Sequence, residues 1–484
     1  MKPADALAAE TFRYESLAQL LTRLIDAGTL EPGTKAPSLR QISRTQGVSV
    51  TTALQAYRLL ESRGILEALP RSGFYVRSAA AHDLPALAVS KPPRRVQPVT
   101  AASRIAHMAE LGADPNLVPL GCAVPSPKLL ASSKLDRFLA RAARNQGEVC
   151  NTYSPPRGEP RLRQAIAHRS LRCGQEIDAE NIVITSGCTE ALHLALKVAT
   201  KPGDTVAIES PTYFSLLQIL QSLGLRVLEL PTDPLSGVSV AALKEALEAG
   251  TISTCLFASS FGNPLGNLTP ERNKRAIIKL LKKHRATLIE DDVYSDIYFG
   301  SDRPLPYSAL DATADIIYCS SFSKTLAPGY RIGWVSCKAH ISDIVEHKFA
   351  LTLANPVLTQ VAMADYLTSG AYDNHLRRIR RQYANAIDQM RLAVAQAFPV
   401  GTRVSRPAGG FVLWLELPTR GNSLGLFDAA IDAGICFAPG DIFTASKRYG
   451  NCLRLSCGHL WDTRIERAVW KLGELATLQI ESSD

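Results

Sequence analysis

The sequence SSFSKTLAPGYRIGW spans residues 320–334 and places Lys324 among small hydroxyl residues, directly after the apolar run DIIYCSS at 315–321. A run of this length with β-branched residues predicts a buried strand, and the Pro-Gly pair that follows predicts a turn. Taken alone, a lysine among serines is usually a surface residue. The surrounding sequence therefore decides whether Lys324 stands at the end of a strand in a larger sheet.

Short apolar runs alternate with helical patterns on both sides of this segment. Strands are predicted at NIVIT, TVAIE, TCLFAS and ATLIEDD, and helices at EALHLALKVA, at YFSLLQILQSL and near 271–284. Such alternation predicts an α/β domain with a mostly parallel sheet covered by helices. From about residue 365 onward, LWLEL and NCLRLSC indicate strands of a smaller α+β lobe. We expect residues 116–484 to form one domain with this lobe at its C-terminal end.

The first eighty residues have a different pattern. Apolar residues at helical spacing predict a first helix: Leu17, Leu20, Leu21, Leu24 and Ile25. Ser38 is positioned to cap a second helix that Gly47 ends, and Ser49 to cap a third that ends at Gly64. ILEAL and GFYVR, separated by PRSG, predict a β-hairpin. Three helices followed by a hairpin predict an all-α, winged-helix unit over residues 1–78.

Residues 79–115 are expected to link these two parts. From Ser78 to about Ser103 the chain is rich in alanine, proline and basic residues and has no periodic apolar face. At 484 residues the whole chain is several times longer than one typical domain of roughly 100–200 residues. The length therefore agrees with a division into a small unit, a linker and a large domain.

Composition narrows the class of protein. With 46% hydrophobic and 20% charged residues, and no apolar run near the roughly 18 residues of a membrane span, no membrane partner is expected. Acidic residues stand where a secretion signal would be apolar, so we expect a cytoplasmic location. The ten cysteines form no CxxC pair, which favours reduced thiols over disulfides or a metal site, and we expect Cys452 and Cys457 to be packing residues.

Net charge suits a polyanionic partner without identifying one. The formal charge is +9, but many basic proteins never bind nucleic acid. Residues 1–80 hold ten Lys/Arg against seven Asp/Glu, a difference of +3. Any case for DNA binding in this unit therefore depends on where the charges lie.

The N-terminal motif carries that case. EPGTKAPSLRQISRTQGVSVTTALQAYRLLESRGIL, followed by RSGFYV, resembles the winged helix-turn-helix of the GntR family of bacterial regulators. The resemblance implies that helix 49–63 enters the major groove of a double-stranded DNA operator. The residues expected at the DNA are Arg40, Ser49, Thr51, Thr52, Arg58, Arg71 and Gly73. Val50 and Leu54 stand where some such domains present arginine, so guanine readout is not expected there. The alternative is an ordinary solvated face.

The Lys324 segment resembles the cofactor-lysine motif of the fold type I aminotransferases, which implies pyridoxal 5′-phosphate (PLP) as cofactor. The resemblance implies that the catalytic Lys324 forms a Schiff base with the PLP aldehyde, and that Arg331 with Ser321 holds the phosphate. TSGCTEAL follows a strand and opens a helix, so that Ser186, Gly187, Cys188 and Thr189 would cradle the same phosphate.

Further motifs of the same resemblance follow in the family's order. Asp291 in LIEDDVYSDIYF would pair with the pyridine nitrogen. Tyr294, with Asn263 of FGNPLG, would donate to the ring phenolate oxygen, and Tyr213 of ESPTYF would stack on the ring. Tyr153 of TYSPPRGEP would reach the phosphate of a neighbouring subunit, which implies a homodimer. Arg454 of NCLRLS would bind the α-carboxylate of an amino acid or 2-oxo acid.

Together the two halves resemble the MocR subgroup of GntR regulators, in which an aminotransferase-like domain serves as the effector domain. The segment LGCAVPSPKLL at 120–130 departs from the usual start of an aminotransferase domain. The first hypothesis is a PLP-dependent transcriptional regulator in which PLP or an amino acid modulates DNA binding of the homodimer. The second is a working aminotransferase with the same residues, and a third is a large domain that only dimerises and binds no PLP.

Overall fold

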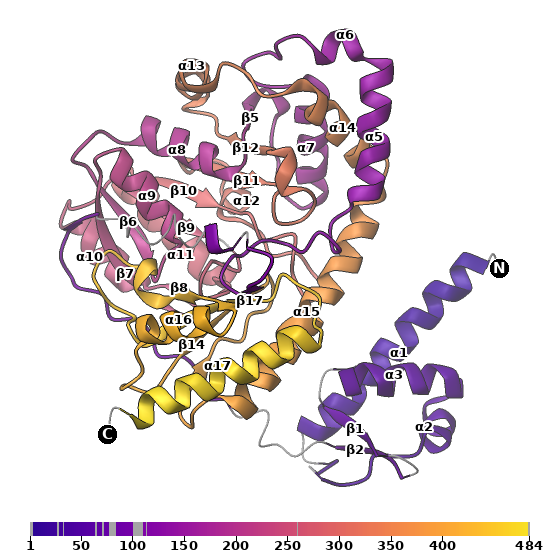
Figure 1. Ribbon diagram of the computed structural model, residues 1–484. Helices are drawn as coiled ribbons and strands as arrows, with labels where there is room; N and C mark the ends of the chain where they lie inside the picture. The colour runs from indigo at the N-terminus through magenta and orange to yellow at the C-terminus, as the bar shows by residue number, and fades with distance from the viewer. Residues whose placement is uncertain are drawn as a thin grey trace.

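The computed structural model describes residues 3–26, 29–31, 33–62, 65–69, 72–76, 84–99, 110–112, 114–258 and 260–482. The N-terminal unit is a small body of its own and the remainder forms a large domain (Figure 1). Within the described chain no helix combines the length and the apolar character that crossing a bilayer requires. The ten cysteines are free, and Cys452 and Cys457 are both buried in the core.

The N-terminal unit confirms the predicted order of elements. Its helices are α1 (Pro3–Asp26), α2 (Leu39–Gln46) and α3 (Val50–Ser62), and its antiparallel hairpin pairs β1 (Leu66–Leu69) with β2 (Gly73–Val76). Ser38 caps α2, because its hydroxyl accepts from the Gln41 amide at 3.2 Å. Gly47 ends the same helix in the left-handed conformation. Tyr57 is fully buried and donates to the carbonyl of Pro37 at 2.7 Å, which fixes α3 against the preceding turn.

The large domain is built on a nine-stranded sheet. Its strands, in spatial order, are β3 (Gln97–Pro98), β7 (Arg226–Asp233), β6 (Thr205–Ser210), β9 (Thr254–Ala258), β10 (Thr287–Asp291), β11 (Ile316–Ser321), β12 (Gly333–Ser336) and β5 (Ile182–Thr185), with β8 (Gly237–Val238) beside β7. The pairs from β7 through β11 are parallel, and β12 is antiparallel to both neighbours. The mostly parallel sheet predicted from the sequence is confirmed.

Helices cover both faces of this sheet (Figure 1). One face carries α8 (Cys188–Ala199), α9 (Phe214–Ser222) and α13 (Ile341–Thr352), and the other α10 (Val240–Glu248), α11 (Glu271–His284) and α12 (Tyr307–Leu310). Consecutive residues of β6 alternate between them: Val206 and Ile208 pack with α8 and α9, whereas Ala207 packs with α10 and α11. Beside the sheet lie α5 (Ser132–Asn145), α6 (Gly147–Cys150), α7 (Pro160–Arg172) and α14 (Val357–Thr368).

The C-terminal lobe is the expected α+β unit. It holds a four-stranded antiparallel sheet of β13 (Arg403–Val404), β14 (Val412–Glu416), β17 (Cys452–Ser456) and β16 (Ala438–Pro439). Its helices are α15 (Ala371–Ala397), α16 (Ser423–Asp432) and α17 (Thr463–Glu481), and a short 3₁₀ helix lies at Gly440–Phe443. Two further 3₁₀ helices, Ala179–Asn181 and Pro328–Tyr330, precede β5 and β12 of the main sheet. β4 (Val118–Pro119) pairs with β15 (Ile435–Cys436), so the start of the large domain is fastened to this lobe.

Part of the expected linker is held against the large domain. Residues 84–99 lie along the large domain, where β3 extends the main sheet by pairing antiparallel with β7. The carbonyl of Pro85 also accepts from the Val404 amide of the C-terminal lobe at 3.3 Å. No periodic apolar face marked this segment, because it is held by backbone hydrogen bonds, which leave little trace in side-chain hydrophobicity.

A buried network of charges joins α7, α15 and the ends of the central strands. Asp296 accepts from Arg169 and from Arg303, both at 2.9 Å, and Arg303 also pairs with Asp292 at 3.2 Å. Although burial acts to raise it, these two guanidiniums hold the pKa of Asp296 well below its usual range. The Tyr372 hydroxyl lies 2.7 Å from Thr325 Oγ1 and 3.2 Å from Asp296, so the network reaches the residue beside Lys324.

We expect Asp296→Asn to lower the free energy of unfolding by about 3 kcal/mol, because it leaves two buried guanidiniums with too few carboxylates. Urea unfolding followed by circular dichroism measures this loss. Asp311→Asn is the control, since Asp311 pairs with Lys282 at 2.8 Å at the surface and its loss costs about 1 kcal/mol or less. Because the pKa of Asp296 is lowered by folding, its contribution is complete at neutral pH and is lost below about pH 4. Equal losses in the two variants would contradict the expectation.

Candidate functional site

The site lies at the carboxyl ends of the central strands. β5 runs parallel to β11, because each is antiparallel to β12, so Thr185, Asp291 and Ser321 end their strands at one edge of the sheet. In open α/β sheets ligands bind outside this edge. The segment containing Lys324 follows β11 directly and therefore lies in the same place.

Lys324 is the amine at the centre of the site. Its side chain is partly buried, and Nζ donates to the carbonyl of Ala123 at 2.7 Å. Burial lowers the pKa of Lys324 to about 8, helped by the nearby guanidinium of Arg454 and opposed by the carboxylate of Asp291. More of the amine is therefore unprotonated near neutral pH than in a free lysine, and the unprotonated form is the one that attacks a carbonyl carbon.

Asp291 is the carboxylate that acts most directly on this amine. It ends β10, and the Cys188 thiol donates to its Oδ1 at 3.7 Å. Burial raises the pKa of Asp291 to about 7, and the negative charge of Asp292 acts in the same direction. A carboxylate held in this way is positioned to stabilise a cationic group brought close to it.

The turn from β5 into α8 forms a cradle with donors. Gly187 has φ +86 at the N-cap of α8, and no side chain caps that helix. Arg331 Nη2 donates to the Ser186 carbonyl at 2.8 Å, and a Cβ on Gly187 would lie 2.4 Å from this Nη2 atom. Cys188 is buried in the first turn of α8 whereas Thr189 is exposed. Free amides at a helix start beside a guanidinium suit an anion such as a phosphate.

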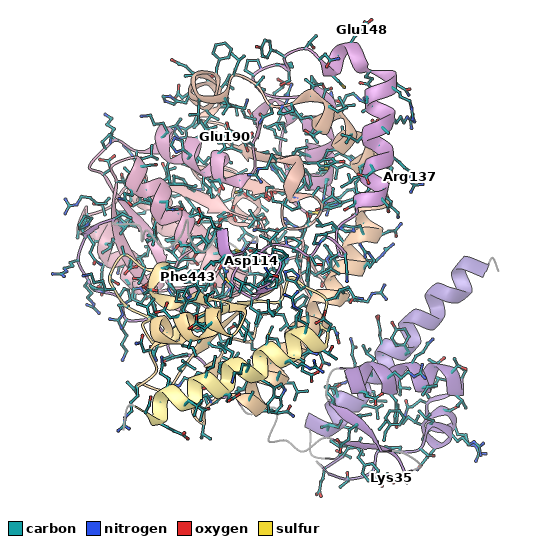
Figure 2. The ribbon with its side chains drawn as sticks, viewed as in Figure 1. Lys35, Asp114, Arg137, Glu148, Glu190 and Phe443 are labelled. Carbon is teal, nitrogen blue, oxygen red and sulfur yellow. The ribbon has the colours of Figure 1, made fainter. Side chains whose placement is uncertain are left out.

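Neighbouring side chains that the sequence did not single out complete this cradle. Asn355 donates to the Ser186 hydroxyl at 2.8 Å, and Glu190, labelled on α8 in Figure 2, accepts from the Ser186 amide. Ser321 is buried and accepts from the Ser323 amide at 3.4 Å, while the buried Ser323 hydroxyl has no partner among the described residues. Asn355 lies 169 positions from Ser186, so no local pattern could have indicated it.

Arg454 is fully buried and its charge is not balanced by a carboxylate in the described part of the chain. Nη1 donates to Asn263 Oδ1 at 3.1 Å and Nη2 donates to the Gly121 carbonyl, while Nε has no partner among the residues that the structure describes. Its guanidinium lies 5.3 Å from the ring of Phe443, which Figure 2 labels where the C-terminal lobe meets the large domain. Burying an unpaired cation is costly, so this site favours a bound anion.

Two tyrosines line the same region. Tyr294 is buried with no hydrogen-bond partner for its hydroxyl among the described residues, and burial raises its pKa. Tyr213 precedes α9, and the centroid of its ring lies 4.7 Å from that of the Phe214 ring. Charges on Arg454 and Asp291 act on both hydroxyls, so the two rings stand within the field of the site. Tyr153, in contrast, is 82% exposed and is not part of this buried centre.

Residues 120–126, here called the cover segment, form one wall of the site. Two of its carbonyls accept hydrogen bonds from cationic side chains: Gly121 accepts from Arg454 and Ala123 accepts from Lys324. The cover segment follows β4 and is held at its other end by the Ser126 amide, which donates to Gly458 at 2.8 Å. The sequence marked this stretch as a departure from the usual pattern but did not indicate that it would contact both cations.

The DNA-binding candidates divide into two groups. Arg40, Thr51 and Arg58 are exposed on α2 and α3, and Gly73 begins the second hairpin strand with φ +106. Ser49 accepts from the Thr52 amide at 3.0 Å, and the two hydroxyls lie 2.7 Å apart. Thr52 is therefore buried in the cap of α3, and the expectation that its hydroxyl reaches DNA is not met. Arg71 lies outside the described residues.

These features define a two-part protein with a winged-helix unit and a large domain of the aminotransferase fold. Residues 126–472 match the family Aminotransferase class I and II, and residues 13–76 match the bacterial regulatory proteins of the gntR family. The chain therefore belongs to the GntR family of regulators with the aminotransferase-like domain of its MocR subgroup.

Relatives of both kinds support this assignment. The uncharacterized HTH-type transcriptional regulator YdcR of Escherichia coli is 38% identical over 96% of this chain and 98% of its own length. The 2-aminoadipate transaminase of Thermus thermophilus is 31% identical over 77% of this chain and 93% of its own length.

Solved structures match the large domain. LysN, the α-aminoadipate aminotransferase of Thermus thermophilus complexed with N-(5′-phosphopyridoxyl)-L-leucine, has a TM-score of 0.73 and 30% identity over 79% of this chain and 96% of its own. The kynurenine aminotransferase of Pyrococcus horikoshii, in complex with PMP, has a TM-score of 0.74 and 28% identity over 78% of this chain and 95% of its own. The fold of the large domain is thus that of the aminotransferases.

We expect Lys324 in the ligand-free protein to react with an amine-acylating reagent in a pH-dependent way, with a midpoint near pH 8. Only the unprotonated amine reacts, and burial together with Arg454 disfavours its charged form. Peptide mass spectrometry after brief labelling measures the rate at each pH. Unfolding in urea is the control, because it should move the midpoint to about 10.4, the value of a free lysine. The same midpoint in folded and unfolded protein would contradict the arrangement described.

Proposed function

We propose that this protein is a PLP-dependent transcriptional regulator, in which the large domain senses PLP or an amino acid and changes how the winged-helix units bind DNA. The observation that carries the proposal is the extent of the matches. YdcR, which is named as an uncharacterized HTH-type transcriptional regulator, aligns along 96% of the chain, whereas the transaminase aligns along 77%. A DNA-binding unit joined to an aminotransferase-like domain is thus common to this chain and to a regulator of nearly the same extent.

The residues of the site fit PLP. Lys324 offers an amine of lowered pKa, and Asp291 offers a carboxylate for the pyridine nitrogen. The uncapped start of α8, from Ser186 to Thr189, with Ser321 and Arg331, suits the phosphate. The buried Tyr294 hydroxyl, which has no partner among the described residues, suits the ring oxygen. Asn263 would bind the same oxygen and Tyr213 would stack on the ring. When bound, PLP supplies an aldehyde for amines and a ring that withdraws electrons.

Arg454 indicates the class of effector. Its guanidinium is buried, and its Nε atom lacks a partner among the described residues. An amino acid or 2-oxo acid would bring a carboxylate to this charge, which arginine can bind through two parallel hydrogen bonds. To reach Arg454, the ligand would replace the Gly121 carbonyl of the cover segment, so binding and movement of this segment are linked.

A homodimer is part of this proposal. Tyr153 is largely exposed, as expected of a side chain that reaches the phosphate in a second subunit. Large apolar side chains are also exposed on α6 and α13, namely Val149, Phe349 and Leu351. Exposed apolar residues of this size suit a contact with another chain. A regulator of this kind would act on DNA in the cytoplasm.

The second candidate function is transamination. It is favoured by the presence of Lys324 and Arg454 together, because an amine that can move a proton and a carboxylate-binding arginine are what amino-group transfer requires. Sensing requires the same two residues. The site therefore supports both functions, and the difference lies in whether the ligand is released as product.

We expect the purified protein to show the visible absorption of bound PLP, and Lys324→Ala to lose it while remaining dimeric. Borohydride treatment followed by peptide mapping should place a pyridoxyl group on Lys324. Adding a panel of amino acids should then shift the band of wild-type protein for one ligand class and leave it shifted without sustained production of keto acid. Continued cycling with a 2-oxo acid acceptor would instead favour the aminotransferase. Unchanged absorption in Lys324→Ala would refute the assignment of this lysine.

We expect Arg40→Glu to weaken DNA binding by about tenfold or more and to reduce its salt dependence, because Arg40 is exposed on α2 where phosphates approach. A duplex recovered by repeated selection from a random-sequence library serves as the probe. Arg272→Glu is the matched control, because it makes the same charge change at an exposed position of α11 in the large domain. PLP absorption should be the same in both variants. Equal DNA affinity of wild type and Arg40→Glu would argue against this placement of the winged helix.

A further inference from the structure

Ser90 fastens the segment that leads from the winged-helix unit to the large domain. Its amide donates to the Thr232 carbonyl at 3.2 Å, and its hydroxyl accepts from the Thr232 amide at 2.7 Å. Thr232 belongs to β7, the strand with which β3 also pairs. Segment 84–99 is therefore held to the main sheet through one side chain as well as through backbone pairing. Its neighbour Val89 is exposed.

Thr232 connects this segment to the end of β6 and to the C-terminal lobe. The Tyr449 hydroxyl of the lobe lies 2.8 Å from the Ser210 hydroxyl at the end of β6. Ser210 is fully buried, and its amide donates to Thr232 Oγ1 at 3.1 Å. Ser90, Ser210, Thr232 and Tyr449, here called the serine node, thus join three parts of the chain: the segment from the N-terminal unit, the main sheet and the lobe.

The serine node is connected to the candidate ligand site through the residues that follow Ser210. Thr212 and Tyr213 follow Ser210 after a single proline, and the Thr212 amide donates to the Phe443 carbonyl at 2.9 Å. Phe443 is the ring beneath the Arg454 guanidinium. A ligand that moves Tyr213 or Arg454 therefore acts on residues that connect closely to the node.

The loop between Phe443 and Tyr449 is held by hydrogen bonds to Glu229. The buried carboxylate of Glu229 accepts from the Thr444 hydroxyl and from the Ser446 hydroxyl, both at 2.6 Å, and from the Ala445 amide at 3.0 Å. Three donors on one carboxylate leave this loop little freedom to deform. Because Glu229 belongs to β7, these bonds fasten the loop that leads to Tyr449 to the same strand that holds Ser90.

We infer that Ser90 is a positioning residue that couples ligand binding to the DNA-binding unit, by tying its connecting segment to Thr232 and, through Thr232 and Ser210, to Tyr449. The inference rests on the proposed function, because it names how that site would regulate. Coupling requires that the ligand favour one of two arrangements. The serine node supplies a contact of the right size, since without the bonds at Ser90 segment 84–99 would be held by β3 and by the hydrogen bond between Pro85 and Val404.

Hydrogen exchange of the full-length protein tests this inference, because the hydrogen bonds between Ser90 and Thr232 involve the backbone amides of both residues. In wild type, PLP should slow exchange in peptides covering 84–93 and 230–233 by about fivefold, the effect that one hydrogen bond of ordinary strength supports. Ser90→Ala and Tyr449→Phe should abolish this PLP-dependent difference while leaving the PLP absorption band and its titration unchanged. Val89→Ala, the exposed neighbour, should behave as wild type, and Ser90→Thr should retain the difference.

The outcomes separate this inference from the proposed function. A purely structural role would speed exchange equally with and without PLP, and that result would overturn the inference. The inference also fails if PLP binds wild type but changes nothing in these peptides. If wild type shows no PLP absorption at all, the proposed function itself fails. Loss of the difference in Ser90→Ala, with Val89→Ala unaffected, supports the coupling.

Discussion

Arg454 carries a guanidinium that is buried in the core, with no carboxylate to balance its charge among the described residues. Groups from the main sheet, the cover segment and the C-terminal lobe surround it. Its partners are neutral oxygens, from Asn263 and Gly121, and the ring of Phe443. Neutral oxygens solvate a cation only in part, so the site is poised for an anion. Because the same charge lowers the pKa of Lys324, carboxylate binding and amine reactivity are linked electrostatically.

The same charge is bound by the cover segment, whose sequence departs from the usual start of an aminotransferase domain. The segment places one carbonyl on Arg454 and another on Lys324, and it continues from β4, which pairs with the C-terminal lobe. In the proposed function, a ligand carboxylate that took the place of the Gly121 carbonyl would change what holds the cover segment, and the lobe attached to it, in place. Such a change would not require that the ligand be consumed.

Local sequence signals predicted most of the fold because each element carries its own pattern. Ser38 and Gly47 defined both ends of α2, and apolar runs marked the strands of the sheet. Motif resemblance brought Lys324, Asp291 and Arg454 into one site. What the sequence did not show depends on pairs far apart in the chain, such as Lys324 with Ala123, 201 residues away. The burial of Thr52 was missed for another reason: a hydroxyl suited to DNA is equally suited to a helix cap.

Regulation and catalysis make opposite demands on such a site. A catalyst gains from releasing its product quickly, whereas a sensor gains from a ligand that stays and whose affinity differs between two arrangements of the protein; a tenfold difference corresponds to about 1.4 kcal/mol. The contacts at Ser90 and Tyr449 are of that size, a few hydrogen bonds each worth about 1 kcal/mol. Contacts much stronger would lock the connecting segment in place, and contacts much weaker would leave the DNA-binding units indifferent to the ligand. A small polar node between a ligand site and a DNA-binding unit is therefore matched to the free energy that one bound amino acid can supply.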